Sequence, residues 1–505
     1  MSEPTSVPDD AALPVGEIAR GSLVSSDETA RRAALWWLWP GVVSLLIGPA
    51  IGILQSLQFT HPEAMEALSA LGLAYSNLRV MHTNIVIYGW LVMAMAAAAV
   101  FVVPQLAKRP LARPQLALVA AWIYLVGLVL DVALIWAHVP DSTWLSIQVY
   151  EYAEAPILAD IFFAVGLVLL TWTLTETVVR RETRWVYVSL WYLLAAFWGT
   201  LFAFVVINFL TPMIRGLGNT YLHGWWIHNA VGLIITPLGV GLGYYVIPKA
   251  TGKPIFSHRL GMLGFWTLYA FYPSIGLHHF LQMPAPIWLN QVAVVSSVLL
   301  VIPVIVVVYN HLASVKQAAH TLIDSFVIRF VVLGAVYYLL TGLQGAFQAN
   351  NVVNPYVHFT EWVQAHAHLA LAAGFTSYAM SGLIYVFPRL TGRQLVSRRA
   401  MSLCFWAMAA IFPLFFAFFT LSGLTAAAGI NVLGKTVYEM IPAQLLPRLF
   451  RTLSGVLLTV GWWTFAWVLW ETRRRGQPFE EGMDEVQREE ATYGAVAQQE
   501  GRLHA

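Results

Sequence analysis

Long apolar stretches alternate with short polar connections along most of the chain. Each apolar stretch has about 20 residues or more, which is the length that crosses a bilayer as an α-helix. We therefore predict an all-α integral membrane protein with twelve transmembrane helices, near residues 35–58, 80–105, 115–137, 156–178, 185–210, 225–248, 259–281, 288–313, 324–349, 362–388, 401–425 and 450–472. The helices form one domain, 35–472, between two polar tails, 1–34 and 473–505.

Lysine and arginine are unevenly divided between the connections. They gather in the even-numbered connections and at both ends of the chain, as at Lys108 and Arg109 or at Arg180 and Arg181. Loops on the cytoplasmic side of a membrane carry such an excess of positive charge. We therefore expect both tails in the cytoplasm. The tail 1–34 contains no apolar core, so we do not interpret it as a signal peptide.

The composition excludes several classes of protein. Hydrophobic residues make up 58% of the chain and charged residues 11%, against about 45–50% and about 25% in soluble globular proteins. A net charge of +2 with scattered basic residues argues against nucleic-acid binding. The only cysteine, Cys404, excludes a disulfide framework, an iron–sulfur cluster and covalent haem attachment within this chain. Any metal must therefore be held mainly by histidine.

A group of histidines falls at one depth of the predicted membrane domain. Its members begin the second, sixth and tenth helices and end the seventh, and they are His82, His228, His278, His279, His366 and His368. Each alone is typical of a helix cap or an interfacial hydrogen bond, but ionisable groups inside a membrane are costly and usually mark a site. Neutral imidazole is a common ligand of haem iron and copper.

Helical geometry separates the roles of these histidines. His366 and His368 point about 200° apart, so one helix can serve two haems on its opposite sides. His82, at the same depth on another helix, can complete a six-coordinate haem with one of them.

The adjacent His278 and His279 differ by about 100° on an α-helix and can converge with His228 on one ion. Three imidazoles with an open position describe a copper or iron site facing a five-coordinate haem.

Several stretches around these histidines resemble the catalytic subunit of the haem-copper oxidase superfamily, closest to the C-family, cbb-type cytochrome c oxidases. They are LRVMHT (78–83), EYAE (151–154), WWIHNAVG (225–232), YYVIPK (244–249), the His278-His279 pair and HFTEWVQAHAH (358–368). The resemblance implies a prokaryotic inner-membrane protein in which His82 and His368 ligate a low-spin haem b and His366 a high-spin haem b. It also implies that copper B is held by His228, His278 and His279.

The same resemblance suggests roles for three outer charged residues. Arg79 matches a family arginine near haem propionates, although a lone arginine there is equally typical of an interfacial anchor. Glu151 and Glu154 match a stretch near a propionate-bridging Ca²⁺, although in isolation they read as a solvated acidic loop.

Oxygen reductases of this superfamily take one electron from a tyrosine cross-linked to a copper-ligand histidine. In the C-family it precedes the His-His pair by six residues, where this chain has Tyr272. On an α-helix, Tyr272 and His278 would lie about 120° apart, so we expect the tyrosine to meet His228 instead. The usual nitric oxide reductases place a glutamate, which binds a non-haem iron, at the position of Gly232. Both residues favour oxygen as the substrate.

Two features keep nitric oxide open as a substrate. The C-family has a glutamate where this chain has Gln344, and a glutamine cannot carry a proton. The run FLQMPAPIW (280–288) is also similar to nitric oxide reductases.

We therefore expect a respiratory terminal oxidase that reduces O2 to water with proton translocation. A nitric oxide reductase is the first alternative. A twelve-helix transporter is the second, and it would need a polar site near the bilayer midplane. An oxidase would need membrane lipid, a partner subunit with haem c or dinuclear copper, and a donor such as cytochrome c, because this chain has no site that receives electrons.

Overall fold

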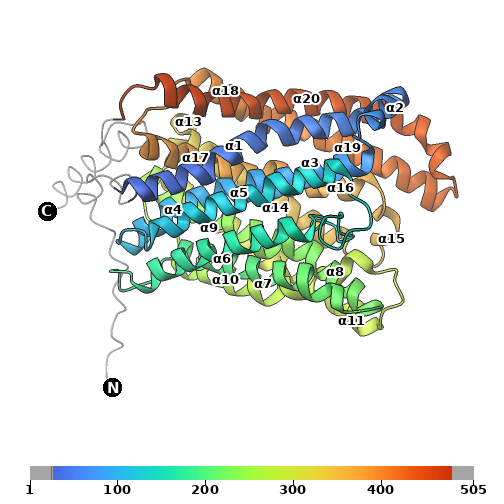
Figure 1. Ribbon diagram of the computed structural model, residues 1–505, viewed down its shortest axis with the longest axis horizontal. Coiled ribbons are helices and arrows are strands. Elements are labelled where there is room, and N and C mark those ends of the chain that lie inside the picture. Colours follow the sequence, from blue (N-terminus) through green and yellow to red (C-terminus); the bar gives the residue numbers. More distant parts are fainter. Residues whose placement is uncertain (1–23, 25–26, 480–505) are drawn as a thin grey trace.

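The computed structural model describes residue 24 and residues 27–479, and it is a bundle of long helices that run side by side (Figure 1). No β-strand occurs between residues 27 and 479. The prediction of an all-α membrane protein is confirmed. Most of the two predicted tails, 1–23, 25–26 and 480–505, lies outside the described residues.

Eleven helical segments of the described part are long and apolar enough to cross a membrane, namely Glu28–Leu57, Tyr75–Ala107, Pro114–Ala137, Ile157–Val179, Val188–Met213, Leu217–Thr251, Ile287–Lys316, Phe326–Gln348, Glu361–Thr391, Arg398–Val432 and Val437–Arg475. The first, α1 (Glu28–Leu57), starts before the predicted residue 35 because Asp27 caps it by accepting from the backbone N–H groups of Thr29 and Ala30. α1 begins and α20 (Val437–Arg475) ends at the same end of the bundle, which we term the terminal end (Figure 1); the opposite end is the distal end.

The predicted seventh helix is present in only part of its length. α10 (His258–Phe271) is followed by two 3₁₀ segments, η6 (Tyr272–Ser274) and η7 (Gly276–Phe280). Pro273 lacks the N–H that would continue the α-helical ladder. A continuous α-helix over 259–281 was therefore a wrong prediction, and the α-helical angles expected for Tyr272, His278 and His279 do not apply.

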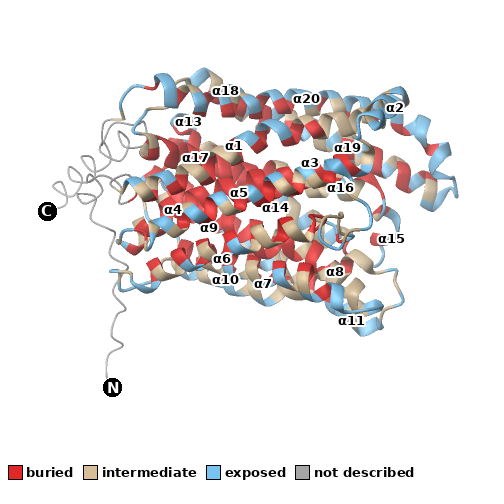
Figure 2. Ribbon diagram, in the orientation of Figure 1, coloured by how far each residue is buried: buried red, intermediate tan, exposed pale blue. Residues whose placement is uncertain are grey.

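Three helical columns form the centre of the bundle. They are α3–η2–α4 (Tyr75–Asn84, Ile85–Val92, Met93–Ala107), α8–η5–α9 (Leu217–Asn229, Ala230–Ile235, Thr236–Thr251) and α16–η8–α17 (Glu361–His368, Leu369–Phe375, Thr376–Thr391). In the best apolar window of each, 94%, 94% and 89% of the residues are buried. Figure 2 shows this buried centre among more exposed helices, among them α5 (Pro114–Ala137), α6 (Ile157–Val179), α7 (Val188–Val205), α11 (Ile287–Leu299), α12 (Val301–Lys316), α14 (Phe326–Gln348), α18 (Arg398–Trp406) and α19 (Phe412–Ala427).

Each central column changes from α-helix to π-helix just after its histidines. η2 begins three residues after His82, η5 begins two residues after His228, and η8 begins directly after His368. A π-helical turn holds an extra residue and re-aims the side chains before it, and such turns are frequent at functional sites. The histidines thus lie where the helical geometry changes, toward the distal end of the bundle.

Candidate metal centres

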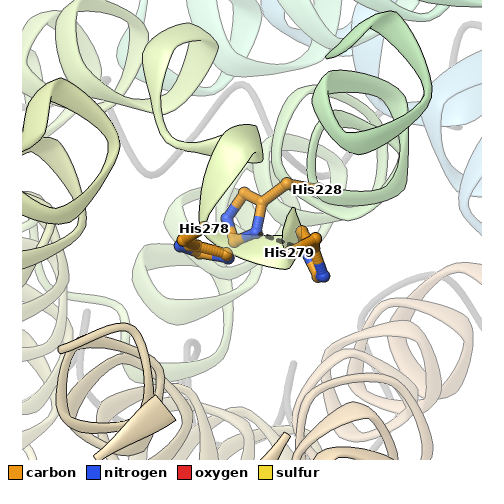
Figure 3. Close-up of side chains that lie close together, drawn as sticks. All are labelled: His228, His278 and His279. Carbon is orange, nitrogen blue, oxygen red and sulfur yellow. Dashed lines mark hydrogen bonds between the residues drawn. The ribbon is translucent and has the colours of Figure 1, made fainter. Parts of the chain in front are cut away.

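His228 of α8 and His278 and His279 of η7 bring their rings together at one point (Figure 3). The possible ligand atoms of these residues all lie within 4.8 Å of one another. His228 Nδ1 is 3.3 Å from His279 Nε2, and the ring centroids of His228 and His278 are 4.6 Å apart. Within the described residues, no other group of three His, Cys, Asp or Glu meets this condition. We call this group the three-histidine site.

A serine fixes one ring of the three-histidine site. The Ser297 hydroxyl donates its hydrogen to the Ala293 carbonyl over 2.6 Å, and it lies 2.7 Å from His278 Nδ1. Because the hydroxyl has only one hydrogen, it accepts from the His278 Nδ1–H, which leaves the Nε2 lone pair for a metal. His228 Nε2 is buried without a hydrogen-bond partner. The donor set therefore fits a copper or iron ion, and sequence reasoning missed Ser297 because its role depends on tertiary contact.

Tyr272 lies against this site and explains Gly232. The Tyr272 ring centroid is 4.8 Å from that of His228. A Cβ added to Gly232 would be only 1.5 Å from Tyr272 Cε1. The tyrosine ring therefore fills the space that any side chain at position 232 would need, and a metal-binding glutamate at 232 is incompatible with Tyr272 in this position.

His82 of α3 and His368 of α16 form a second candidate site, which we call the two-histidine site. Their ring centroids are 6.2 Å apart and their planes differ by 17°. His82 Nδ1 lies 2.8 Å from the Gly48 carbonyl oxygen, and His368 Nδ1 lies 2.8 Å from that of Gln364. A carbonyl only accepts, so both Nδ1 atoms carry hydrogen and both Nε2 atoms are free to bind metal. Two metal–imidazole bonds of about 2 Å, together with the ring radii, account for this separation.

His366, two residues before His368, turns to another neighbour. Its Nδ1 is 3.3 Å from Gln344 Oε1 on α14, and a Cβ on Gly345 would lie 3.3 Å from His366 Cε1. An amide oxygen accepts from an imidazole N–H, which again leaves Nε2 for a metal. Gln344, noted in the sequence as a departure from the family pattern, therefore contacts the predicted ligand of the high-spin haem.

Arg79 and Glu154 form a partly buried ion pair. Arg79 Nη2 donates to Glu154 Oε1 over 2.6 Å, and Glu154 is 3% exposed. Burial raises the pKa of the Glu154 carboxyl, and the attraction of Arg79 opposes this shift. Glu151 is exposed, and its backbone N–H donates to His223 Nε2 over 2.8 Å. Glu154 Oε2 is left without a hydrogen-bond partner, so one oxygen is available to a cation.

Sequence reasoning missed an ion-pair network beside the two-histidine site. Glu361 accepts from Arg448 over 2.8 Å and from Arg451 over 2.9 Å. Arg451 lies 4.7 Å above the Phe419 ring, whose centroid is 5.1 Å from that of His368. Two guanidinium groups share one carboxylate, so an excess of positive charge lies near His368 and suits an anionic group. The sequence did contain a signal for this network, because Arg448 and Arg451 lie among the connections that otherwise carry few basic residues.

Comparisons with known proteins relate the chain to respiratory oxidase subunits. A family profile described as "Cytochrome C and Quinol oxidase polypeptide I" matches residues 32–465. The chain is 26% identical over 454 residues to the cbb3-type cytochrome c oxidase subunit CcoN1 of Stutzerimonas stutzeri, covering 87% of this chain and 94% of that protein. It is also 26% identical over 450 residues to a cytochrome c oxidase subunit 1 homologue of Azorhizobium caulinodans, covering 86% and 80%.

The fold is also similar to that of a solved heme-copper terminal oxidase that was described as a dimer. The two structures superpose with a TM-score of 0.72 at 16% sequence identity, covering 88% of this chain and 84% of the other. At this identity the likeness concerns the fold.

Proposed function

Because the chain belongs to the cytochrome c and quinol oxidase polypeptide I family, we propose that it is the catalytic subunit of a membrane terminal oxidase that reduces O2 to water. The observation that carries this proposal is the position of Tyr272, whose ring contacts His228 in the space left open by Gly232. That arrangement supplies a phenol beside a metal ligand and excludes an acidic side chain from the same place.

Membership of the family makes the chain a haem- and copper-binding protein. We assign a low-spin haem b to the two-histidine site, a high-spin haem b to His366, and copper B to the three-histidine site. When bound, these groups supply the electrons and the position at which O2 reacts. Four of the histidines would hold these groups through Nε2, because the partners of Nδ1 set the orientation of their rings; they are His82, His368, His278 and His366.

Tyr272 provides the reaction with a proton and an electron from one side chain. Complete reduction of O2 takes four electrons, and a phenol at the metal supplies one without release of a partly reduced product. The contact between the Tyr272 and His228 rings places the phenol beside a metal ligand, so the electron crosses no intervening residue. Burial of Tyr272 keeps water from the side chain.

Protons for the reaction need a route through the terminal half of the bundle. A buried polar group lies there, in which Asn310 donates to the Tyr244 hydroxyl over 3.2 Å and His311 Nδ1 is 3.0 Å from the Tyr378 hydroxyl. His311 Nε2 is buried without a hydrogen-bond partner. These groups support proton delivery from the terminal end, which we assign to the cytoplasm. Buried polar side chains inside a membrane domain commonly serve proton relays.

Electrons must reach this chain from other subunits. Its one cysteine cannot attach a haem c or build a dinuclear copper site. We therefore propose an oxidase complex in which a subunit with haem c or dinuclear copper receives electrons from cytochrome c or a similar donor. Arg79 and the Glu361 network would face haem propionates, and Glu151 and Glu154 would contribute to a Ca²⁺ site.

Nitric oxide reduction is the second candidate function. It is favoured by Gln344, which contacts His366 where the C-family has a glutamate, and by the run 280–288. That reaction needs fewer electrons and no phenol. A transporter is not compatible with membership of the oxidase family.

The decisive experiment is turnover of the purified complex with O2 and with NO in parallel, for the wild type and for Tyr272→Phe. We expect the variant to keep its haem spectrum and to lose nearly all O2 turnover, while NO turnover changes much less. Tyr269→Phe is the matched control, because Tyr269 is a half-buried tyrosine three residues away that packs on Phe265 and not on His228. Wild-type O2 turnover in Tyr272→Phe would reject the oxidase proposal, and iron without copper in metal analysis would favour nitric oxide reduction.

A further inference from the structure

Two buried aspartates of the membrane domain take no part in the sites above. Asp131 on α5 and Asp160 on α6 are both 0% exposed. Asn84 Nδ2 donates to Asp131 Oδ1 over 3.1 Å, but Asp131 Oδ2, both oxygens of Asp160 and Asn84 Oδ1 have no hydrogen-bond partner. Among the described residues, neither aspartate forms an ion pair with a basic side chain.

The two aspartates lie where α5 and α6 cross closely. A Cβ on Gly127 would be 3.1 Å from Phe163 N and 3.2 Å from Ala159 O. Asp131 follows Gly127 by about one turn toward the distal end, and Asp160 directly follows Ala159. The carboxyl groups therefore belong to one level of the bundle, between the crossing point and the distal end.

Aromatic rings close this level on its terminal side. The Phe163 ring lies 5.4 Å from Tyr88, 4.8 Å from Tyr124 and 6.3 Å from Phe204. The Tyr124 hydroxyl donates to the backbone carbonyl of Tyr88, and the Tyr88 hydroxyl donates to the backbone carbonyl of Tyr152. They are therefore not donors to the aspartates.

One turn from this aromatic layer toward the distal end, polar side chains replace the rings. Three polar residues each lie about one helical turn from an aromatic residue of the same segment. These pairs are Asn84 and Tyr88, Asp160 and Phe163, and Asn208 and Phe204. Asn208 is 4% exposed, and neither its amide oxygen nor its nitrogen has a partner. A buried layer of two carboxyls and two amides thus contains several polar atoms that are unsatisfied.

Two unpaired carboxylates at one level inside a membrane domain are costly, so this layer must hold at least one proton or a cation. Arg79 is engaged by Glu154 and forms no ion pair with either aspartate. The described residues supply no third carboxylate or imidazole that would complete a metal site with Asp131 and Asp160. A proton needs only one carboxyl oxygen and is the occupant that these side chains fit.

The layer is connected to a predicted haem ligand through α3. Asn84 follows His82 by two residues, so the two side chains point about 200° apart around the helix. His82 faces α1, where its Nδ1 meets Gly48, while Asn84 faces Asp131. The carboxyl layer therefore lies behind the ligand helix, within about one helix diameter, 10–12 Å, of the two-histidine site. Charge at that site acts on the layer through a poorly screening interior.

We propose that Asp131 and Asp160 form a proton-holding site that takes up one proton when the low-spin haem at His82 and His368 gains one electron. The proton adds to a carboxylate oxygen and gives a neutral carboxylic acid, and it leaves again when the electron leaves. The electron stays on the haem, so the charge of the region is unchanged by each reduction. This inference rests on the proposed function in one respect, namely a haem bound at the two-histidine site.

The test is redox-difference infrared spectroscopy of the purified complex under anaerobic conditions, without O2 or NO. We expect reduction of the low-spin haem to produce a protonated-carboxyl C=O band that shifts in D2O. The band should disappear in Asp131→Asn and in Asp160→Asn, and the pH dependence of the low-spin haem potential should flatten in both variants. Asp324→Asn, which changes an exposed aspartate of α13 (Thr321–Asp324), should keep both properties.

If the asparagine variants do not fold, wild-type protein with isotope-labelled aspartate side-chain carboxyls replaces them, because the predicted band must then shift with the label. A band that does not respond to label or substitution overturns the proposal. Carboxylate bands with a haem potential that depends on added Na⁺ or Ca²⁺ also overturn it, in favour of a bound cation. Failure of O2 turnover with an intact band rejects only the proposed oxidase function, whereas absence of haem rejects both.

Discussion

The two-histidine and three-histidine sites are held by different parts of the polypeptide. In the two-histidine site, both Nδ1 atoms meet backbone carbonyls, those of Gly48 and Gln364. In the three-histidine site, His278 Nδ1 meets a side chain, the Ser297 hydroxyl. Backbone carbonyls cannot be removed by substitution, whereas a side-chain partner can. The comparison indicates that the rings of the two-histidine site are oriented by the backbone, whereas the orientation of His278 depends on a side chain that substitution can change.

The largest expected effect is the loss of one metal group without the other, depending on which site is mutated. His82→Ala or His368→Ala removes a predicted haem ligand and should abolish the low-spin haem signal, while copper stays largely bound. His228→Ala or His278→Ala should do the reverse, with loss of most copper and of turnover but retention of both haems. Optical spectra and metal analysis of the four variants check this. A bis-histidine spectrum in His82→Ala would show that the pairing is wrong.

Gly232→Ala should disturb the three-histidine site without removing a ligand. The new methyl group would collide with Tyr272 Cε1, since the Cβ position is 1.5 Å from that atom. We expect a destabilisation of about 1–3 kcal/mol from overpacking and severe loss of O2 turnover, with an unchanged low-spin haem spectrum. Thermal denaturation and oxygen consumption measure the two effects. Gly392→Ala is a control for substitution away from the site, because nothing lies within 4 Å of the added Cβ, although its positive φ makes it a strained position.

Ser297→Ala tests the side-chain support directly. Loss of an outer-shell hydrogen bond to a ligating histidine typically costs about 10–100-fold in metal affinity or activity. We expect that loss for copper, measured by competition with a chelator, and none for either haem. Ser296→Ala, which removes the neighbouring hydroxyl that bonds Ser274, should have a smaller effect on copper. Equal copper affinity in wild type and Ser297→Ala would remove the distinction between the sites.

The smallest expected effect concerns the backbone-supported site. Gln364→Ala removes an exposed side chain but keeps the carbonyl that meets His368 Nδ1, so the low-spin haem spectrum and potential should not change. Gln344→Leu, by contrast, removes the acceptor for His366 and should shift the potential of the high-spin haem. Redox titrations of both variants compare the two kinds of support.

The sequence was sufficient for the helical class and the family, because the length of an apolar stretch and the order of residues in a motif are local properties. It was not sufficient for the geometry after Phe271, where Pro273 converts the expected α-helix into 3₁₀ segments. The hydrophobic pattern of the sequence did not predict the π-helical turns after His82, His228 and His368 either.

Contacts between residues that are far apart in the sequence could not be predicted from local patterns either. Ser297 is 19 residues from His278, and Arg451 is 90 residues from Glu361. A serine in an apolar helix and an arginine near a helix end are common, so only the packed structure shows which of them supports a ligand. The predicted roles of the six histidines, Tyr272, Arg79, Glu151 and Glu154 remain predictions.

The close fit of Tyr272 over Gly232 has a consequence for how such an enzyme can change its chemistry during evolution. A single mutation to glutamate at position 232 would leave the new side chain without space, and a single loss of the tyrosine would leave a void without a new metal ligand. Descent from an oxygen-reducing ancestor to a site with a glutamate ligand therefore passes through at least one intermediate that is poor at either reaction. A glutamate at position 232 and the loss of Tyr272 must therefore occur together before the new side chain has space beside His228.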